Sequence, residues 1–458
     1  MPTTRPLLRA LLLTTFLVLC GPGRSLAQVP PGLEGRWSGA AIENGTPILF
    51  ELEFEVVDDS LHTTLTQPYS GYSRFPYPFR YEGGRLKSGL FGDEMDLLVD
   101  LRRGQLRGTV VNEGEVTQTV FLQRVLDFPL PGIREEEVSF RAGSDTLAGS
   151  LLLPDGPGPY PAIVFVAGRG YGSRYGSYDL ASTLVRFGIA GLVVDARGTG
   201  RSTGDNATAT SLDRVEDVAA GLDFMRDRSE ISSDHLGLLS NSAGGWIVPV
   251  VAAERNDVAF IVTLVGPAES LAYQQGHVIE ALMRRSDESF TDDEFRAAFE
   301  YQKRLVELSY DGAEWSAFKP LIETARSKRW ARFVDLPESL ANPELDYYRR
   351  RQDYDPTEAL RNTRIPLLAI YCEDDYVVPP EVNVPVLQNL LEEAGNADFE
   401  IVVLAEVNHS IALTSGFVGD GEWPDRYYQP WTRSPDLIPT ILDWLRPRLE
   451  LDRPRNGR

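Results

Sequence analysis

Alternating apolar and polar residues dominate the first third of the chain. Residues 48–57 alternate from Phe50 onward, residues 118–123 are rich in β-forming side chains, and glycine-containing turns separate such runs. A period of two is typical of strands with one buried face. We therefore expect a small antiparallel β domain, a sandwich or a barrel, over residues 33–126. The aromatic stretch at residues 69–79 suits a loop that contacts a ligand or packs between domains.

The pattern changes after a linker that contains Pro129, Pro131 and Gly132. Continuous apolar runs, typical of strands covered on both faces, occur at residues 161–167, 189–194, 235–239, 259–265, 365–371 and 401–404. Helical spacing appears at residues 178–187, 213–226 and 246–254. This alternation predicts an α/β domain with a mostly parallel sheet over residues 135–450. Residues 267–364 are charged and helix-rich, which predicts a helical cap inserted between two strands.

The N-terminal segment has the features of a signal peptide. Arg5 and Arg9 precede an apolar run at residues 10–20, and the small-residue sequence that ends in Ala27 follows. The run is too short to span a bilayer. We expect residues 1–27 to be removed after Ala27, which predicts a secreted or periplasmic protein with no stable membrane span.

Composition excludes several classes of function. Acidic residues outnumber basic ones by 67 to 45 among 458 residues, a net charge of −22 that disfavours binding to nucleic acid. Four His and two Cys are too few for a disulfide framework or a Cys-based zinc site. The HExxH zinc motif, the EF-hand calcium loop and the Walker A nucleotide-binding motif are also missing from the sequence. We therefore expect no metal and no cofactor.

Two serines compete as a nucleophile. The pattern G-x-S-x-G occurs once, around Ser202, but in a loop well beyond the preceding strand rather than at a sharp strand-to-helix turn. Ser242, in contrast, follows the run at residues 235–239 and precedes an expected helix. Ser240 and Gly244 are small, which such a turn requires because the backbones nearly touch. A helix N-terminus at Ser242 would stabilise negative charge, although a capping serine in a glycine-rich turn has the same pattern.

The position of each histidine selects one as a general base. His409 lies in a loop after the strand at residues 401–404. His62 belongs to the β domain, and His277 comes early in the cap. His235 begins the strand that leads to Ser242, and about 20 Å separates them at about 3.3 Å per residue. A triad on such a sheet follows the chain order Ser, Asp, His, which only His409 satisfies.

The acid and the oxyanion site are expected at the ends of neighbouring strands. Asp374 and Asp375 both follow the run at residues 365–371, and either could orient an imidazole. An oxyanion needs two backbone amides. Ala243 supplies one, and the glycine-rich loop at residues 166–170 is the source expected for the other.

These residues together resemble the α/β-hydrolase superfamily over about residues 135–450, and are most similar to bacterial esterases, serine aminopeptidases and dienelactone hydrolases. The matching segments are 167–170 for HGxG, 195–202 for D-x-R-G-x-G-x-S, 240–245 for GHSxGG, 372–379 for G-x-x-D-x-V-x-P, and Asn408-His409 for the histidine loop. Residues 34–39 also resemble the EGxWxG start of β modules that precede some bacterial hydrolases.

The resemblance implies a role for each residue. Ser242 is the nucleophile, His409 the general base and Asp375, selected over Asp374, the residue that orients His409; Ser202 is structural. The resemblance also implies an oxyanion hole formed by Ala243 and Arg169. It further implies that Gly168, Gly170 and Asn241 bind the substrate.

The expected function is hydrolysis of a small-molecule carboxylic ester through an acyl-enzyme. A serine peptidase with the same triad is the first alternative, which an acidic lining from the cap would favour. Arg169 would instead suit an anionic acyl group. A non-catalytic binding protein is the second alternative. The sequence leaves the oligomeric state open.

Overall fold

The computed structural model describes residues 29–451 apart from 31, 44–45, 58–59, 68–71, 91–92, 125–132, 170–171, 351–354 and 415–432. The expected signal peptide lies outside the described residues. The chain forms two compact units: one built on residues up to 125, and one that contains residues 126–458 with the stretches 49–52 and 64–76. Among the described helices, none combines the length and apolar character needed to cross a membrane.

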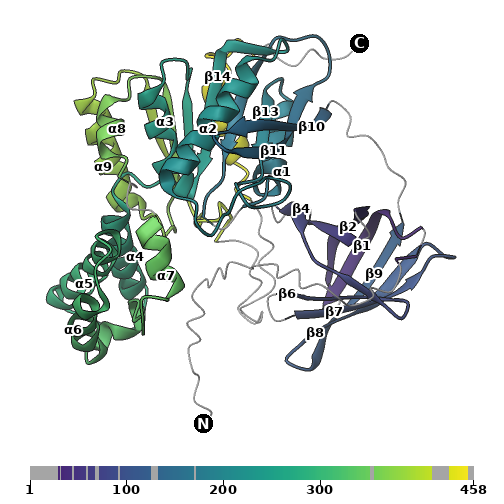
Figure 1. The fold of residues 1–458 in the computed structure, drawn as a ribbon, viewed down its shortest axis with the longest axis horizontal. Helices are drawn as coiled ribbons and strands as arrows, with labels where there is room; N and C mark the ends of the chain where they lie inside the picture. The colour runs from purple at the N-terminus through teal and green to yellow at the C-terminus, as the bar shows by residue number, and fades with distance from the viewer. Residues whose placement is uncertain are drawn as a thin grey trace. The chain divides into compact units, whose positions relative to one another are not determined.

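An antiparallel sheet makes up the N-terminal part of the chain (Figure 1). Its strands are β1 (Gly35–Glu43), β2 (Thr46–Val57), β3 (Ser60–Gln67), β4 (Tyr72–Pro76), β5 (Arg80–Glu82), β6 (Arg85–Leu90), β7 (Asp93–Asp100), β8 (Gln105–Asn112) and β9 (Glu115–Arg124). They are ordered β4-β3-β2-β1-β9-β8-β7-β6-β5. The edge strands β4 and β5 are consecutive in the chain. The Tyr77 amide donates to Thr63 of β3, and Pro78 accepts from Ser88 of β6. The strands therefore form an antiparallel meander in which the first strand, β1, also pairs with the last, β9.

Close packing explains the glycine–tryptophan pattern at the start of β1. Trp37 is fully buried, and its indole N–H donates to the Leu33 carbonyl at 2.9 Å. Gly39 pairs with Leu122 of β9, and a Cβ at Gly39 would lie 2.1 Å from the Phe121 carbonyl oxygen. The pattern thus serves the packing of β1 on β9.

The second sheet is the mixed, mostly parallel sheet that the sequence predicts. Its order is β10-β11-β13-β12-β14-β15-β16-β17, and only β10 and β11 run antiparallel to their neighbours. The strands are β10 (Ile133–Ala142), β11 (Asp145–Pro154), β12 (Tyr160–Val166), β13 (Ala190–Val194), β14 (Ile231–Asn241), β15 (Ile261–Leu264), β16 (Leu367–Cys372) and β17 (Phe399–Leu404).

Helices cover both faces of this sheet (Figure 1). One face packs against α2 (Ser211–Arg226), α3 (Val248–Glu254) and α9 (Pro380–Glu393). The other face packs against α1 (Tyr175–Val185) and α10 (Leu437–Leu445). Leu238 faces the first core and Leu239 the second, so β14 is buried on both sides. A continuous apolar run is the expected sequence of such a strand.

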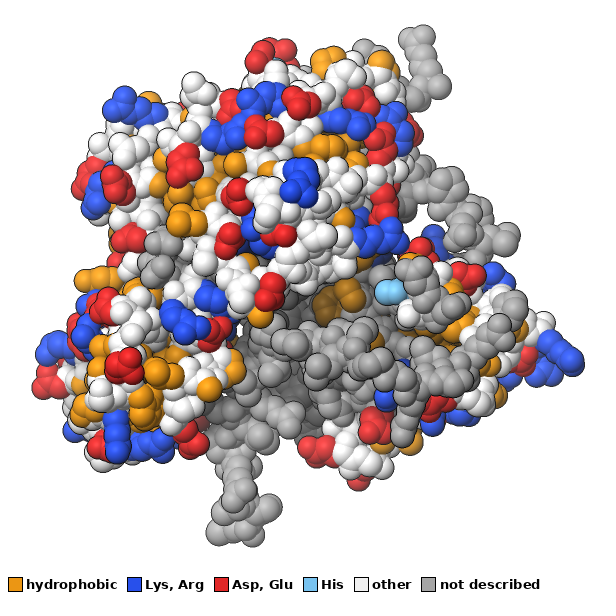
Figure 2. Space-filling model, in the orientation of Figure 1, with side chains coloured by type: hydrophobic (Ala, Val, Ile, Leu, Met, Phe, Trp, Pro, Cys, Tyr) orange, Lys and Arg blue, Asp and Glu red, His pale blue; other side chains and the backbone are white. Residues whose placement is uncertain are grey.

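Charged side chains of both signs lie interspersed on the face shown in Figure 2. Arg226 and Arg255, for example, both pair with Asp223 and Asp257. Such pairs bring opposite charges together but leave the net charge at −22. They add little stability, because an exposed ion pair contributes about 0–1 kcal/mol.

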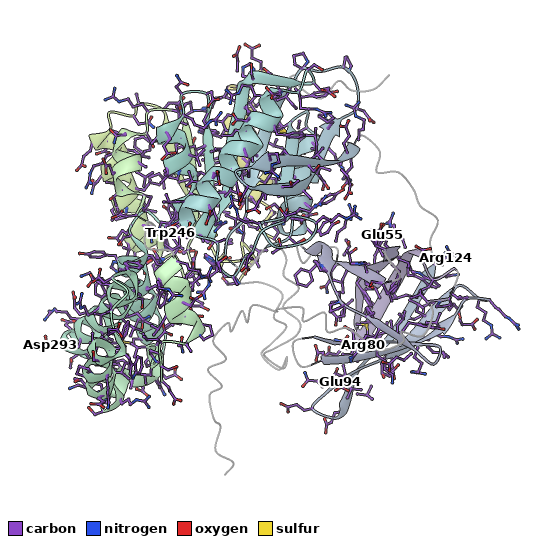
Figure 3. All side chains as sticks on the ribbon, viewed as in Figure 1. Glu55, Arg80, Glu94, Arg124, Trp246 and Asp293 are labelled. Carbon is purple, nitrogen blue, oxygen red and sulfur yellow. The ribbon has the colours of Figure 1, made fainter. Side chains whose placement is uncertain are left out.

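The cap is inserted between β15 and β16 and contains α4 (Leu271–Arg284), α5 (Asp292–Tyr310), α6 (Trp315–Arg326), the 3₁₀ helix η2 (Arg329–Phe333), α7 (Pro343–Arg350) and α8 (Thr357–Asn362). Figure 3 shows Trp246 of the sheet domain where that domain meets the cap. The Trp246 indole donates to the Glu269 carbonyl at 2.8 Å, just before α4 begins. The inserted helices thus start beside a residue that is fixed to η1 (Ser242–Trp246), the 3₁₀ turn after β14.

Three local features refine the sequence prediction. Residues 72–76 of the aromatic stretch form a strand rather than a loop, because they pair with β3. The helix expected at 246–254 is confirmed as α3 (Val248–Glu254), which begins two residues later with a proline in its first turn and is preceded by a 3₁₀ turn, η1 (Ser242–Trp246). Residues 133–142, for which the sequence gives no strand, form β10 because they pair with β11.

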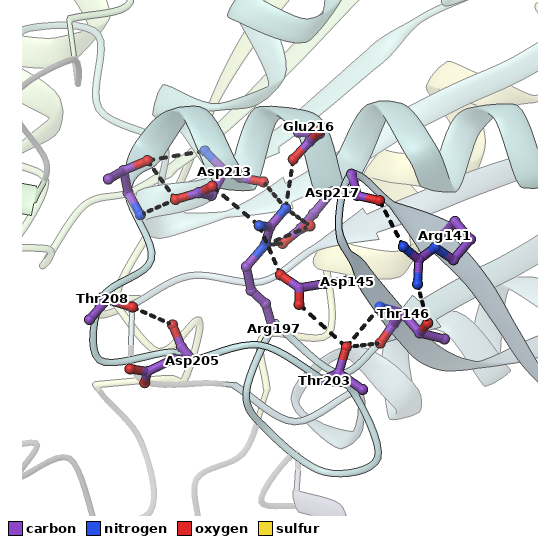
Figure 4. A network of polar contacts seen from close by, with 12 residues as sticks. Arg141, Asp145, Thr146, Arg197, Thr203, Asp205, Thr208, Asp213, Glu216 and Asp217 are labelled. Atoms are coloured by element: carbon purple, nitrogen blue, oxygen red, sulfur yellow. Dashed lines mark hydrogen bonds and ion pairs between the residues drawn. The ribbon is translucent and has the colours of Figure 1, made fainter.

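Arg197 fastens the loop after β13 to α2 (Figure 4). Its guanidinium lies 3.1 Å from Asp145, 3.2 Å from Asp213, 2.9 Å from Glu216 and 2.7 Å from Asp217. The Asp217 hydrogen bond raises the pKa of Arg197 above its usual value, whereas burial raises the pKa of Asp217. One cation thus lies among four carboxylates and reduces the repulsion between them.

We predict that Arg197→Met lowers the free energy of unfolding by about 3 kcal/mol at pH 7, because it leaves nearby carboxylates without a cation. The deficit should shrink as the pH falls toward 4. An Asp whose folded-state pKa is raised destabilises the fold at pH values above its unfolded-state pKa, and the penalty disappears as the pH falls to that value and the group is protonated in both states. Urea unfolding at several pH values measures this. Arg296→Met, at an exposed pair with Asp293, is the control and should cost under about 1 kcal/mol.

A deficit for Arg197→Met that stays constant between pH 7 and pH 4 would contradict carboxylate repulsion as its cause.

Candidate active site

Ser242 lies at the carboxyl end of the central strand β14, between β12 and β15. Asn241 is extended, with φ −122° and ψ 136°, whereas Ser242 has φ 48° in the left-handed region. Ala243 continues into the 3₁₀ turn η1. This is the sharp strand-to-helix turn that holds a serine hydroxyl above the edge of a sheet. The left-handed conformation of Ser242 is rare for a residue other than glycine.

Small residues make this turn possible. A Cβ at Gly244 would lie 2.7 Å from the Val166 carbonyl oxygen and 3.0 Å from the Ser240 Cβ. A Cβ at Gly245 would lie 2.6 Å from the Gly266 Cα. Ser240 fits with its hydroxyl fully buried and without a hydrogen-bond partner, so it fills the position of the family's usual glycine at some energetic cost.

The structure brings Ser242, His409 and Asp375 together. His409 Nε2 lies 3.0 Å from Ser242 Oγ, and Nδ1 lies 2.7 Å from Asp375 Oδ2. A carboxylate only accepts hydrogen bonds, so Nδ1 is the donor to Asp375 and Nε2 is left to accept the serine hydroxyl. The His409 side chain keeps 23% of its surface exposed, whereas that of Asp375 is fully buried.

Backbone amides hold the acid in place. The amides of Val377 and Val378 donate to Asp375 Oδ1 at 2.8 and 2.9 Å, which leaves Oδ2 for His409. Asp374, the alternative that the sequence allows, instead accepts a hydrogen bond from Thr414. The two neighbouring carboxylates therefore have different partners, and Asp375 is the one that meets the imidazole.

The histidine loop is fixed by its own turn. The Asn408 side-chain oxygen accepts from the amides of Ser410 at 3.0 Å and Ala412 at 3.2 Å. This is the local bonding by which Asn favours turns. The imidazole of His409 is thus carried on a short constrained loop after β17.

The other three histidines lie elsewhere. His62 is in β3 of the N-terminal sheet. His235 is within β14, and its Nδ1 lies 3.0 Å from the Ser232 hydroxyl. His277 is in α4 of the cap, where Nε2 lies 3.1 Å from Glu269. Each position agrees with the location expected from the sequence.

Ser202 has a structural environment. Its hydroxyl donates to the Asp195 carbonyl at 2.7 Å and accepts from the Ala148 amide at 2.9 Å. These bonds tie the loop after β13 to β11. The only G-x-S-x-G pattern therefore marks a turn rather than the serine beside His409.

The residues expected to bind an oxyanion or a substrate surround Ser242. Ala243 follows it and is buried. Gly168 is close enough that a Cβ there would lie 3.1 Å from the Ser242 Cβ. Asn241 has a buried side-chain oxygen without a hydrogen-bond partner. Gly170 lies outside the described residues.

Arg169 has a partner that the sequence could not indicate. Its guanidinium donates to both carboxylate oxygens of Glu344, at 2.8 and 2.7 Å. Glu344 belongs to α7 of the cap, 175 positions along the chain. Arg169, which the sequence suggests would suit an anionic acyl group, thus already has an anionic partner within the chain. Nothing in the helical spacing of the cap marks Glu344 as its partner.

Cys372 lies at the end of β16, close to the acid, and is fully buried. Burial, with a contribution from the Asp375 charge, raises the pKa of its thiol to about 12. The thiolate is the reactive form of cysteine, so this residue is a small apolar side chain rather than a nucleophile. In the part of the chain that the structure describes, no three His, Cys, Asp or Glu side chains are grouped to hold a metal ion.

We predict that Gly244→Ala lowers the free energy of unfolding by about 1–3 kcal/mol, because the added methyl group would lie 2.7 Å from the Val166 carbonyl oxygen. Gly221→Ala is the matched control. Gly221 lies within α2, and a Cβ there would make ordinary contacts at 3.4 Å or more. That change should be neutral or stabilise by up to about 1 kcal/mol. Urea unfolding compares them, and equal stability of the two variants would contradict close packing at the turn.

Comparisons with known proteins agree with this architecture. A family model described as the alpha/beta hydrolase family matches residues 163–418. Esterase EstD of Thermotoga maritima is 23% identical over 327 residues, which cover 69% of this chain and 71% of the esterase.

Solved structures that resemble the chain include alpha/beta hydrolase GrgF from Penicillium sp. sh18, with 15% identity, a TM-score of 0.44, and 69% of this chain and 99% of that chain covered. Acetyl xylan esterase 1 from Thermoanaerobacterium sp. JW/SL YS485 has 16% identity and a TM-score of 0.41 over 72% of this chain and 86% of that chain. Because the family model spans more than half of its length, the chain belongs to the alpha/beta hydrolase family.

Proposed function

We propose that the protein is a serine hydrolase that cleaves carboxylic esters of small molecules. The observation that carries the proposal is the continuous relay from Ser242 Oγ to His409 Nε2 at 3.0 Å and from His409 Nδ1 to Asp375 Oδ2 at 2.7 Å. Both distances lie within hydrogen-bond reach, which proton transfer requires. The relay is built on three strand ends that only the fold brings together.

In this scheme Ser242 Oγ attacks the acyl carbonyl while His409 Nε2 takes the hydroxyl proton. Asp375 holds the imidazole in the tautomer with hydrogen on Nδ1 and stabilises the imidazolium that forms. The amides of Ala243 and Arg169 stabilise the oxyanion of the tetrahedral intermediate. His409 then gives its proton to the departing alcohol. In the second half, His409 deprotonates a water that attacks the acyl-enzyme, and the protonated His409 then returns the proton to Ser242 Oγ as the acid is released.

Contacts of the cap favour an ester over a peptide substrate. A peptidase that holds a substrate amine needs an acidic group free to receive it. Glu344 is a cap carboxylate that approaches the oxyanion loop, and both of its oxygens are bonded to Arg169. The Thermotoga maritima relative is an esterase by name, which points in the same direction. A non-catalytic binding role leaves the Ser242–His409–Asp375 relay without a purpose.

We predict that a fluorophosphonate probe labels the wild type at Ser242, and that Ser242→Ala abolishes labelling. Ester hydrolysis should fall by about 10⁴-fold or more in Ser242→Ala, and substantially in Asp375→Asn, which favours the wrong imidazole tautomer. Mass spectrometry locates the label, and p-nitrophenyl ester assays measure turnover. Ser202→Ala, the control at the other pattern serine, should keep the label.

Absence of label on folded wild-type protein would contradict the enzymatic proposal. Activity that survives in Ser242→Ala would show that another residue is the nucleophile. Faster cleavage of aminoacyl-anilides than of p-nitrophenyl esters would replace the esterase by the peptidase.

We also propose that the protein is exported and processed after Ala27, as the basic start, apolar run and small residues before the cleavage site support. Expression of the full-length chain in a bacterial host should yield mature protein that begins at Gln28, outside the cytoplasm. N-terminal sequencing of fractionated cells measures this. Arg5→Glu with Arg9→Glu should retain the precursor in the cytoplasm, and unprocessed wild-type protein found there would contradict export.

A further inference from the structure

Arg169 connects the oxyanion loop to the cap. It follows Gly168, the residue that abuts Ser242, and its guanidinium donates to Glu344 at 2.8 and 2.7 Å. The guanidinium carbon also lies 3.9 Å from the centre of the Tyr347 ring. Glu344 and Tyr347 both belong to α7, so this one helix supplies an anion and an aromatic face to the same cation. Such contacts are the strong ones for arginine.

The helix that carries Glu344 is anchored on its own account. The side chain of Asn342 accepts from the amides of Glu344 at 2.8 Å and Leu345 at 3.4 Å at the start of α7. Leu345 is buried, and so is Tyr348, whose hydroxyl donates to Asp335 at 2.7 Å. The stretch of α7 that carries Glu344 is therefore anchored within the cap independently of Arg169.

Pairing removes the charge that Arg169 would otherwise present to a substrate. Burial alone would lower the pKa of Arg169, but Tyr347 and Glu344 raise it above its usual value, so the guanidinium is charged and its partner compensates that charge. The side chains of Arg169 and Glu344 keep 37% and 34% of their surfaces exposed, so a substrate could reach them. A free guanidinium binds a carboxylate through two parallel hydrogen bonds from two of its nitrogens. Both edges that can do so include Nη2, and Nη2 of Arg169 already donates to both oxygens of Glu344.

We propose that Glu344 determines acyl specificity: it occupies the carboxylate-binding edge of Arg169, so the enzyme accepts uncharged acyl groups and discriminates against acyl groups that carry a carboxylate. The inference rests on the proposed esterase function. The chemistry stays with Ser242, His409 and Asp375, and Glu344 sets only the charge that a bound acyl group meets beside the oxyanion loop.

The test compares two esters of equal acyl length, p-nitrophenyl hexanoate and the p-nitrophenyl monoester of adipic acid. Glu344→Gln keeps the size of the side chain and removes its charge. The ratio of kcat/KM for the adipate ester to that for the hexanoate ester should rise by about tenfold, mainly through a lower KM for the adipate ester. The double variant Glu344→Gln with Arg169→Met should return the ratio to the wild-type value.

Glu323→Gln is the matched control, because Glu323 is an exposed carboxylate of the same cap on α6. It should leave the ratio unchanged. Arg169→Met alone gives an independent measurement, since it leaves the Glu344 carboxylate without its cation. That variant should favour an ester with a terminal ammonium group on its acyl chain, 6-aminohexanoate, relative to hexanoate by about tenfold.

An unchanged adipate-to-hexanoate ratio in Glu344→Gln, or an equal fall for both esters, would overturn the inference and leave Glu344 with a structural role only. If Glu344→Gln does not fold, an unchanged charge preference in Arg169→Met would overturn it in the same way. Failure of the wild type to hydrolyse either ester would instead contradict the proposed function, so the two failures are distinguishable.

Discussion

The site depends on the left-handed backbone of Ser242 at the end of β14. A residue with a side chain in this conformation costs on the order of 1–3 kcal/mol, and it persists only where the surroundings leave no alternative. Here the surroundings are backbone: Gly244 lies against the Val166 carbonyl, and Gly245 lies against Gly266. The strand before the turn is buried on both faces, so it cannot shift to relieve the strain. The packing around β14 and its turn thus fixes the position of the Ser242 hydroxyl.

The parallel sheet places the His409 imidazole and the Asp375 carboxylate near the Ser242 hydroxyl. Strands β14, β15, β16 and β17 pair in parallel in that order, so their carboxyl ends share one edge. Ser242 and His409 are 167 positions apart in the chain, yet their side chains meet at 3.0 Å. Each loop is then held by its own short-range bonds, from Asn408 to the amides that follow it and from the Val377 and Val378 amides to Asp375. The register of the parallel strands thus brings the three loops together, and hydrogen bonds within each loop orient its side chain.

This division explains what the sequence could predict. Strand ends carry their own pattern, an apolar run that stops at a polar or glycine residue, and that pattern located Ser242, His409 and the acid pair. Arg169–Glu344 has no such pattern, because it joins a loop to a cap helix whose docking no periodicity records. The strand at residues 72–76 was missed because its pairing with β3, rather than its own composition, makes it a strand. Likewise, the 3₁₀ turn at Ser242 replaces the expected start of a helix because tertiary packing overrides propensity.

In the proposed scheme, catalysis and selectivity belong to different parts of the chain. Ser242, Asp375 and His409 come from loops of the sheet domain, whereas Glu344 comes from an insertion between β15 and β16 that contributes no strand to the sheet. Altering the inserted helices therefore leaves the register of the strand ends unchanged, since β15 and β16 pair directly with each other. The strained turn, in contrast, tolerates little change because its contacts are backbone to backbone. In the proposed scheme the sheet edge carries the reacting groups, and the cap sets the charge that a substrate meets beside them.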